Sequence, residues 1–188
     1  GLTVKYFMGD AFDKSAGSIK VTTDDGKTAN VNMSDESVSV EGFNANAVGT
    51  QNVTVRYTDG GNSYTDTVSV QVYEVGSVKF TAPGKLTYKS HDTELKINDG
   101  YFIVTAKDDP TLTKPVSLTR DMIIKDFDPS VATRENLESA ITQEVEVEYL
   151  GNTFTFQVTI TYSGVSLMLD AIESLKELNW ENSIPTYT

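Results

Sequence analysis

The chain contains no cysteine, one histidine and one tryptophan among its 188 residues. The lack of cysteine excludes disulfide bonds, zinc–thiolate sites and thiol nucleophiles, and the lone His91 excludes any metal site that needs two histidines. Basic residues are also scarce, since 15 Lys and Arg stand against 27 Asp and Glu, for a net charge of −12. Nucleic acids and anionic membrane surfaces are bound by clustered Lys and Arg, so neither is expected as a partner.

Long apolar runs are absent as well. No stretch approaches the ~20 residues that a membrane-spanning helix needs, and no charged-then-apolar leader opens the chain. No membrane span is therefore expected in this sequence. A first residue that is Gly1 rather than Met suggests a processed or recombinant fragment of a longer protein.

β-branched and aromatic residues are abundant, with nine tyrosines and eight phenylalanines. Such residues suit a pleated, half-buried surface and favour an all-β fold. Apolar and polar residues alternate with period two over Glu144–Tyr149 and Phe154–Tyr162, which is typical of strands with one buried face. Further strands are expected at Ser18–Thr23, Thr28–Met33, Val53–Tyr57, Thr67–Tyr73, Gly100–Ala106 and Pro115–Leu118.

The sequence contains two divergent copies of one pattern, from about Leu2 to Glu74 and from about Gly76 to Gly164. Landmarks recur in the same order while the loops differ in length, as in related domains. We call these copies the first and the second repeat. The matched pairs are Tyr6 with Tyr88, Phe12 with Leu95, Gly17 with Gly100, Ile19 with Phe102, Val21 with Val104, Met33 with Leu118, Phe43 with Phe127, Val53 with Val145 and Val68 with Phe156.

Sheets of this size must bury one face against another sheet, so two tandem β-sandwiches are predicted. We place them at residues 1–75 and 76–163, joined near Glu74–Ser77 as an elongated and stiff pair. An insertion over Pro129–Ile141 is expected to hold a turn of helix.

Residues 164–188 do not follow the alternating pattern of the two repeats. Apolar side chains at helical spacing predict a short amphipathic helix over Ser166–Leu178, capped by Ser166 and ended by Asn179. The remaining Trp180–Thr188 is expected to be a linker.

Several segments of the first repeat resemble the bacterial immunoglobulin-like (Ig-like) domains. The resemblance is carried by Tyr6–Asp13, Gly17–Val21, Asp25–Thr28, Val38–Phe43 and Val48–Tyr57. The second repeat resembles a divergent member, since it retains Tyr88, Asp92, Leu95, Gly100, Phe127, Asp128 and Val145–Phe154. It departs from the pattern where His91 replaces Gly9 and where Asp108–Pro110 replaces an Asp-Gly turn.

The resemblance implies two tandem Ig-like β-sandwiches that act as a spacer, stalk or adhesion module. Such modules occur on bacterial cell-surface and secreted proteins and are not enzymes. The expected function is therefore non-catalytic support or display of another domain, with neighbouring domains of a larger surface protein as partners. The alternative is a sandwich that binds a carbohydrate or a host protein. No cofactor, metal ligand or catalytic residue is assigned, because fold alone does not define a function.

Some residues nevertheless have side chains that could form a metal, sugar-binding or catalytic site. Four acidic pairs have the oxygen ligands that calcium prefers, although none fits the Asp-x-Asp-x-Asp-Gly loop. Tyrosines on a surface could stack on sugar rings, whereas strand tyrosines usually pack. His91 is expected to be an ordinary loop residue, and a Ser–His–Asp arrangement lacks a Gly-x-Ser-x-Gly motif. The sequence leaves open a covalent cross-link between a lysine and an asparagine or aspartate. The acidic pairs are Asp10 with Asp13, Asp24 with Asp25, Asp108 with Asp109 and Asp126 with Asp128, and the tyrosines are Tyr64, Tyr73, Tyr101 and Tyr187.

Overall fold

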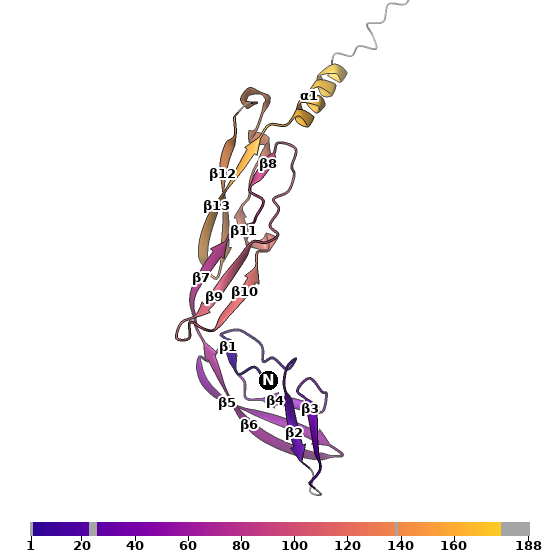
Figure 1. The fold of residues 1–188 in the computed structure, drawn as a ribbon, viewed down its shortest axis with the longest axis vertical. Coiled ribbons are helices and arrows are strands. Elements are labelled where there is room, and N and C mark those ends of the chain that lie inside the picture. Colours follow the sequence, from indigo (N-terminus) through magenta and orange to yellow (C-terminus); the bar gives the residue numbers. More distant parts are fainter. Residues whose placement is uncertain (1, 23–25, 138, 178–188) are drawn as a thin grey trace, which may run out of the picture. The chain divides into compact units, whose positions relative to one another are not determined.

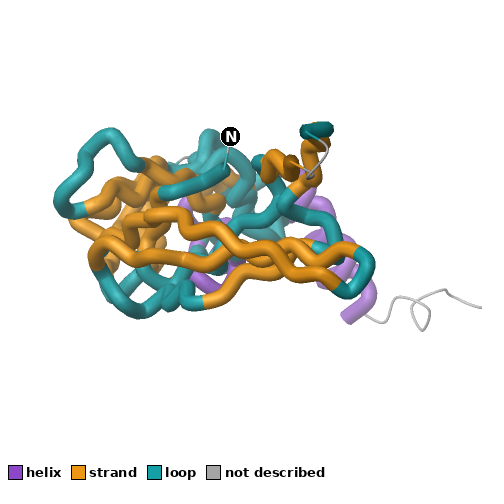
Figure 2. Tube along the Cα trace, turned by 90° about the horizontal axis from the view of Figure 1, so that it is seen from below, coloured by secondary structure: helices purple, strands orange, loops and turns teal. Residues whose placement is uncertain are grey.

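The structure is a computed structural model that describes residues 2–22, 26–137 and 139–177. Strands dominate the fold, and one α-helix, α1, spans Gly164–Glu177 (Figure 2). The chain divides into two compact units, residues 1–79 with 103–114 and residues 80–102 with 115–188. The all-β prediction is confirmed, and the predicted boundary between residues 75 and 76 stays a prediction.

The first repeat contains a four-stranded sheet and a separate hairpin (Figure 1). The sheet has the order β1-β6-β5-β4, in which β1 runs parallel to β6 and the other neighbours are antiparallel. The hairpin pairs β2 with β3. The strands are β1 (Lys5–Phe7), β2 (Ser18–Thr22), β3 (Thr28–Asn32), β4 (Val38–Glu41), β5 (Gly49–Asp59) and β6 (Asn62–Tyr73). Glycines at positive φ, Gly60 and Gly61, close the turn between β5 and β6, where they avoid the steric cost of a side chain.

Apolar side chains between this sheet and the hairpin form the core of the first repeat. Val53, Val70 and Val72 alternate with less buried residues along β5 and β6 and are almost completely buried. Met33 and Val55 are buried beside Ile19 of the hairpin. The two layers therefore form the predicted sandwich, because each covers the apolar face of the other.

The second repeat adds one strand to the same plan. One sheet has the order β11-β12-β13-β8, with β8 parallel to β13, and the other has the order β10-β9-β7 (Figure 1). The strands are β7 (Val75–Thr81), β8 (Thr87–Lys89), β9 (Tyr101–Ala106), β10 (Thr113–Ser117), β11 (Ile123–Lys125), β12 (Ile141–Tyr149) and β13 (Asn152–Thr161). Strands β8, β13, β12 and β11 thus repeat the order of β1, β6, β5 and β4, while β9 and β10 correspond to β2 and β3.

Matching polar contacts support this correspondence. The hydroxyl of Tyr6 donates to the carbonyl of Thr3 at 2.8 Å, and the hydroxyl of Tyr88 donates to that of Lys85 at 3.0 Å. Gln51 bonds both backbone groups of Asn44, accepting from its N–H and donating to its carbonyl. Gln143 does the same with Asp128. Identical roles at equivalent positions are what two copies of one domain would give.

The structure adds one strand to the prediction and moves one helix boundary. Residues Val75–Thr81, which were not predicted as a strand, form β7, and it begins inside the expected link. Gly76 and Ser77 suggested a link, whereas backbone pairing with β9 makes the segment extended. Helix α1 begins at Gly164, so Ser166 lies inside it and is not its cap. The predicted end at Asn179 and the linker Trp180–Thr188 lie outside the described residues.

Other predicted elements differ only at their ends. In both long hairpins the backbone pairing reaches beyond the segments that the alternation predicted, at Gly49–Asn52 and Ile141–Gln143 as well as next to the turns. The turn of helix expected in the insertion is present as two 3-10 turns, Pro129–Val131 and Arg134–Asn136. Among the described helices, none is both long enough and apolar enough to cross a membrane.

Candidate functional site

A groove of about 540 Å³ opens in the first repeat between strands β2 and β6. Its floor is apolar and reaches the core at Met33, Val55 and Val68. Polar and aromatic side chains stand around it. Its lining includes Leu2, Ile19, Lys20, Val21, Tyr57, Tyr64, Asp66 and Val68. The groove is within the size range of small-ligand sites, roughly 300–1,000 Å³.

Two tyrosines form an aromatic ledge on this groove. Tyr57 and Tyr64 face each other across β5 and β6, and their rings stack with centroids 6.4 Å apart and planes at 25°. Tyr64 is 55% exposed, whereas Tyr57 is half-buried. An exposed ring held by a stacked neighbour offers a rigid flat surface with little conformational entropy to lose.

The other tyrosines singled out in the sequence lie elsewhere. Tyr73, at the end of β6, is half-buried. Tyr101 is 39% exposed and lines a separate hollow of about 770 Å³ in the second repeat. Tyr187 lies outside the described residues. The fold thus places only Tyr64 on the groove and supplies Tyr57, which the sequence did not single out as its partner.

The acidic pairs serve the local backbone and nearby cations. Asp13, Asp109 and Asp128 each accept a hydrogen bond from the backbone N–H two residues further on, which is the geometry of an Asx turn. Asp10 accepts from the backbone N–H of Phe7, and Asp126 accepts from that of Phe127. Asp24 and Asp25 lie outside the described residues. Within residues 2–22, 26–137 and 139–177, no group of three or more acidic or histidine side chains could hold a metal ion.

These contacts depress carboxyl pKa values. Hydrogen bonds from Ser15 and Ser130 lower the pKa of Asp13 and of Asp128, respectively. The pKa of Asp109 is lowered to about 2, mainly by its hydrogen bond from the Lys5 ammonium and then by the hydroxyl of Thr111. The charged forms are favoured because each donor interacts better with a carboxylate than with a carboxylic acid.

Acidification is therefore expected to destabilise the fold, with Asp109 contributing over a defined range. Its folded pKa of about 2 lies below the unfolded value of about 3.9. Its stabilisation is present above pH ~4 and is lost as the pH falls toward 2. We expect Asp109→Asn to lower Tm slightly at pH 7, since exposed ion pairs contribute little, and to flatten the decrease in Tm between pH 5 and pH 2. Thermal melts across this range measure both effects.

The neighbouring Asp108→Asn is the matched control for this titration. It removes a carboxylate from the same loop without touching the contacts of Asp109 with Lys5 and Thr111. An Asp109→Asn chain whose melts keep the full acid dependence, or an equal flattening by Asp108→Asn, would contradict the assignment.

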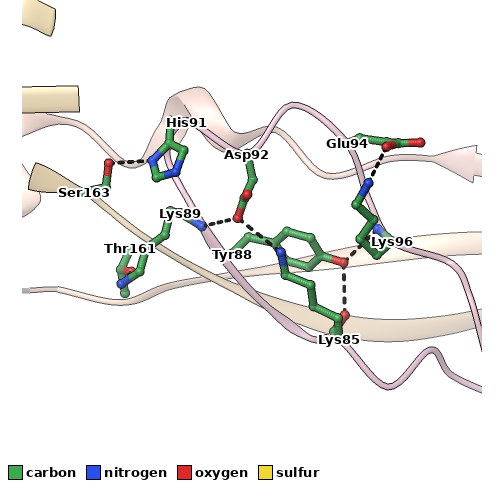
Figure 3. A network of polar contacts seen from close by, with 9 residues as sticks. All are labelled: Lys85, Tyr88, Lys89, His91, Asp92, Glu94, Lys96, Thr161 and Ser163. Atoms are coloured by element: carbon green, nitrogen blue, oxygen red, sulfur yellow. Dashed lines mark hydrogen bonds and ion pairs between the residues drawn. The ribbon is translucent and has the colours of Figure 1, made fainter. Parts of the chain in front are cut away.

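His91 lies in a polar network at the end of β8 (Figure 3). Its Nδ1 is 2.7 Å from the hydroxyl of Ser163, which is 8% exposed and follows β13. The adjacent carboxylate of Asp92 instead accepts from the backbone N–H of Lys89 at 2.8 Å and pairs with Lys85. A hydrolytic triad needs an accessible serine and a carboxylate that orients the histidine. The contact of His91 with Ser163 instead links the loop after β8 to the chain that leaves β13.

The groove was missed in the sequence because it depends on which strands face each other. One signal was available. Asp66 in β6 is equivalent to Phe154 in β13. Asp66 pairs with Val55 and Phe154 pairs with Val147, and these two valines occupy equivalent positions in the two repeats. A charged residue at a position that is aromatic in the other copy indicates a more open site.

The layered sheets, the terminal parallel strands and the duplicated tyrosine contacts define a protein made of Ig-like β-sandwich domains, two in tandem with a short C-terminal helix. Residues 4–72 match the family described as bacterial Ig-like domain, group 3. The first domain of this chain is a bacterial Ig-like domain, which confirms the resemblance seen in its sequence. No curated protein matched the chain. Domains of this family are typically non-catalytic structural modules and occur in bacterial surface and extracellular proteins.

Proposed function

We propose that the chain is a non-catalytic mechanical spacer of a bacterial cell-surface or secreted protein. It would support or display an adhesion domain or another functional domain, with neighbouring domains of the same protein as its partners. The family of the first domain supports this role, as does the acidic surface, whose net charge of −12 disfavours association of neighbouring copies.

The observation that carries the proposal is the parallel pairing of terminal strands. Strand β1 begins the first repeat and lies parallel to β6, which ends it. Backbone bonds from Gln71 to Val4 and from Met8 to Tyr73 extend this pairing beyond β1. Tension that pulls the start of β1 away from the end of β6 acts along both strands, so their hydrogen bonds share the load. The second repeat has the same arrangement, with β8 parallel to β13.

Single-molecule pulling tests this role. The chain has no cysteine, so introduced cysteines become unique handles. Handles from Val4→Cys and Glu74→Cys load β1 against β6 in shear, whereas handles from Val48→Cys and Glu74→Cys separate β5 from β6 at the end where Gly49 faces Val72. We expect a markedly higher unfolding force for the first pair, because shear must break several hydrogen bonds together and unzipping breaks them in sequence.

Equal forces in the two geometries would overturn the mechanical role, and so would unfolding through the Val4 handle at the lowest measurable force. Both chains share the Glu74 handle and the same core, so a difference in global stability cannot produce the contrast. Melting temperatures of the two cysteine variants, measured without load, provide the control.

A second function is favoured by the aromatic ledge. Tyr64 is exposed, stacks on Tyr57 and stands beside the carboxylate-bearing Asp66. A flat ring with neighbouring acceptors is suited to a sugar, whose C–H face stacks and whose hydroxyls donate. The alternative function is therefore carbohydrate binding at this groove. A glycan array on which Tyr64→Ala loses signals that the unmodified chain shows would support it, and an unmodified chain with no signal would reject it.

A further inference from the structure

The hollow of about 770 Å³ in the second repeat is lined by the loop before β9 and by the end of β10, all within the second unit. The N–H of Leu118 donates to the carbonyl of Gly100 at 2.9 Å, which holds these two segments side by side. Tyr101 is 39% exposed on the outward face of β9, while the next residue, Phe102, is buried on the inward face. The hollow therefore offers an exposed aromatic ring on a strand that is anchored in the core.

Polar side chains without a partner line the same hollow as this ring. Among the described residues, four of its exposed polar side chains have no hydrogen-bond or ion-pair partner. They are those of Asn98, Asp99, Ser117 and Thr119. Together they present a carboxylate, an amide and two hydroxyls to whatever enters the hollow, so both donors and acceptors are available there.

The carboxylate of Asp99 differs from the other aspartates described above. Asp109 and Asp128 accept hydrogen bonds from backbone N–H groups two residues further on, whereas Asp99 makes no such bond within the described chain. Its φ is +69°, in the left-handed region that aspartate tolerates better than most residues. The next N–H, that of Gly100, donates to the carbonyl of Ile97 at 3.1 Å. The backbone thus closes this turn without using the carboxylate, which stays available to a ligand.

The fold does not require these side chains. The equivalent Gly17 and Gly100 fix the alignment of the two repeats here, and the first repeat enters its strand with small residues and no aromatic ring or carboxylate. Its Ser15, Ala16 and Ser18 stand where the second repeat has Asn98, Asp99 and Tyr101. The ring and the carboxylate are therefore additions to a shared scaffold.

An anionic ligand is disfavoured in this hollow. Arg120 is the one cationic residue of its lining, and its guanidinium is already paired with Glu94 at 3.2 Å and with Asp126 at 3.3 Å. The free carboxylate of Asp99 repels a negative charge. The charge of the lining thus selects against anions.

A simple cation would use only part of the site. It pairs with a carboxylate and accepts nothing, yet three of the four free side chains also carry a hydrogen-bond donor. A neutral sugar uses the whole set. Its hydroxyls donate to a carboxylate and accept from an amide or a hydroxyl, while its C–H face stacks on an aromatic ring.

We propose that this hollow binds a neutral pyranose unit of a polysaccharide. The C–H face of the sugar stacks on Tyr101, one hydroxyl donates to the carboxylate of Asp99, and another accepts from the amide of Asn98. A chain that supports another domain would then also attach to a neutral polysaccharide in its surroundings. The proposal depends neither on the mechanical role nor on the groove of the first repeat.

Nuclear magnetic resonance of the full chain with three neutral probes, cellohexaose, mannohexaose and N-acetylated chitohexaose, tests the site. We expect at least one probe to shift the amide signals around Tyr101 with a Kd below about 1 mM, and to leave those of β6 unchanged. Tyr101→Ala should weaken binding by about tenfold, near the most that one ring contact contributes, whereas Tyr101→Trp should retain it. Asp99→Asn keeps a residue that tolerates positive φ and should weaken binding by about fivefold, because an amide oxygen accepts more weakly than a carboxylate.

Tyr64→Ala is the matched control, since it removes an exposed ring from the groove of the first repeat and should leave the affinity unchanged. The amide spectrum of Tyr101→Ala without a probe separates a lost contact from a lost fold.

Three results would overturn the proposal. The first is a chain whose signals around the hollow shift with none of the neutral probes. The second is binding that Tyr64→Ala weakens and Tyr101→Ala does not, because the groove would then be the sugar site. The third is tighter binding of hexalysine or hexagalacturonate than of every neutral probe, because the ligand would then be charged. None of these results changes the pulling forces, so failure here leaves the mechanical role intact.

Discussion

Replacing Phe102 by alanine is expected to lower the unfolding free energy of the second unit by about 3–5 kcal/mol, the usual cost of removing a buried aromatic ring. Phe102 is 0% exposed, and its ring centroid lies 4.8 Å from that of Tyr149 and 5.5 Å from that of Phe154. No disulfide supports this core, so no covalent link offsets the free energy lost when the cavity forms. Urea unfolding followed separately for each unit measures the loss.

The adjacent Tyr101→Ala is the control, because Tyr101 is 39% exposed and points away from this cluster along β9. Its substitution should cost well under half as much. The same experiment tests the domain division. Phe102→Ala should shift one transition and leave the transition of the first unit in place. A single transition that moves as a whole would contradict two independently folding sandwiches.

Gly76→Ala is the second substitution with a large expected effect. A Cβ at this position would lie 2.5 Å from the Cα and 2.8 Å from the backbone nitrogen of Lys107. Both are backbone atoms, so the clash can be relieved only if β7 and the chain after β9 move apart. That movement would strain the backbone bond from Lys107 to Glu74, which is 3.0 Å long. We expect a loss of about 1–3 kcal/mol, the usual cost of forcing extra atoms into a close contact, measured by chemical denaturation.

Gly84→Ala provides the comparison for Gly76→Ala. The nearest atom to a Cβ at Gly84 is a carboxylate oxygen of Asp99 at 4.0 Å, an ordinary contact. This alanine should be nearly neutral. If the two alanines cost the same, the close approach of β7 to Lys107 is wrong.

Much of the fold could be predicted from the sequence because its strands are half-buried. Val145 and Val147 alternate with glutamates, so one face of β12 had to be covered. The repeat reinforced this, since a pattern that occurs twice at matched positions is difficult to attribute to chance. Tyr6 and Tyr88 were paired from sequence alone, and both make the same hydrogen bond three residues back.

The missed features depend on contacts between segments distant in the sequence. Strand β7 has a weak local pattern, with Gly76 and Ser77 near its start, and its pairing with β9 makes it extended. The contact of His91 with Ser163 joins residues far apart in the chain. The ledge of Tyr57 and Tyr64 requires the register of β5 against β6. None of these partners is encoded in the local alternation from which strands are predicted.

By itself, then, the sequence determined the all-β class, the duplication and the residues that face inward, because period-two alternation and composition report directly on which side chains avoid water. Only the tertiary structure decided that β9 pairs with a further strand in the second repeat while β2 pairs, among the described residues, with β3 alone, and hence where the groove lies. That difference arises from the position of one strand, β7, along β9. Strand pairing is a long-range choice, made by the backbone hydrogen bonds and aromatic contacts that become available only once the layers meet.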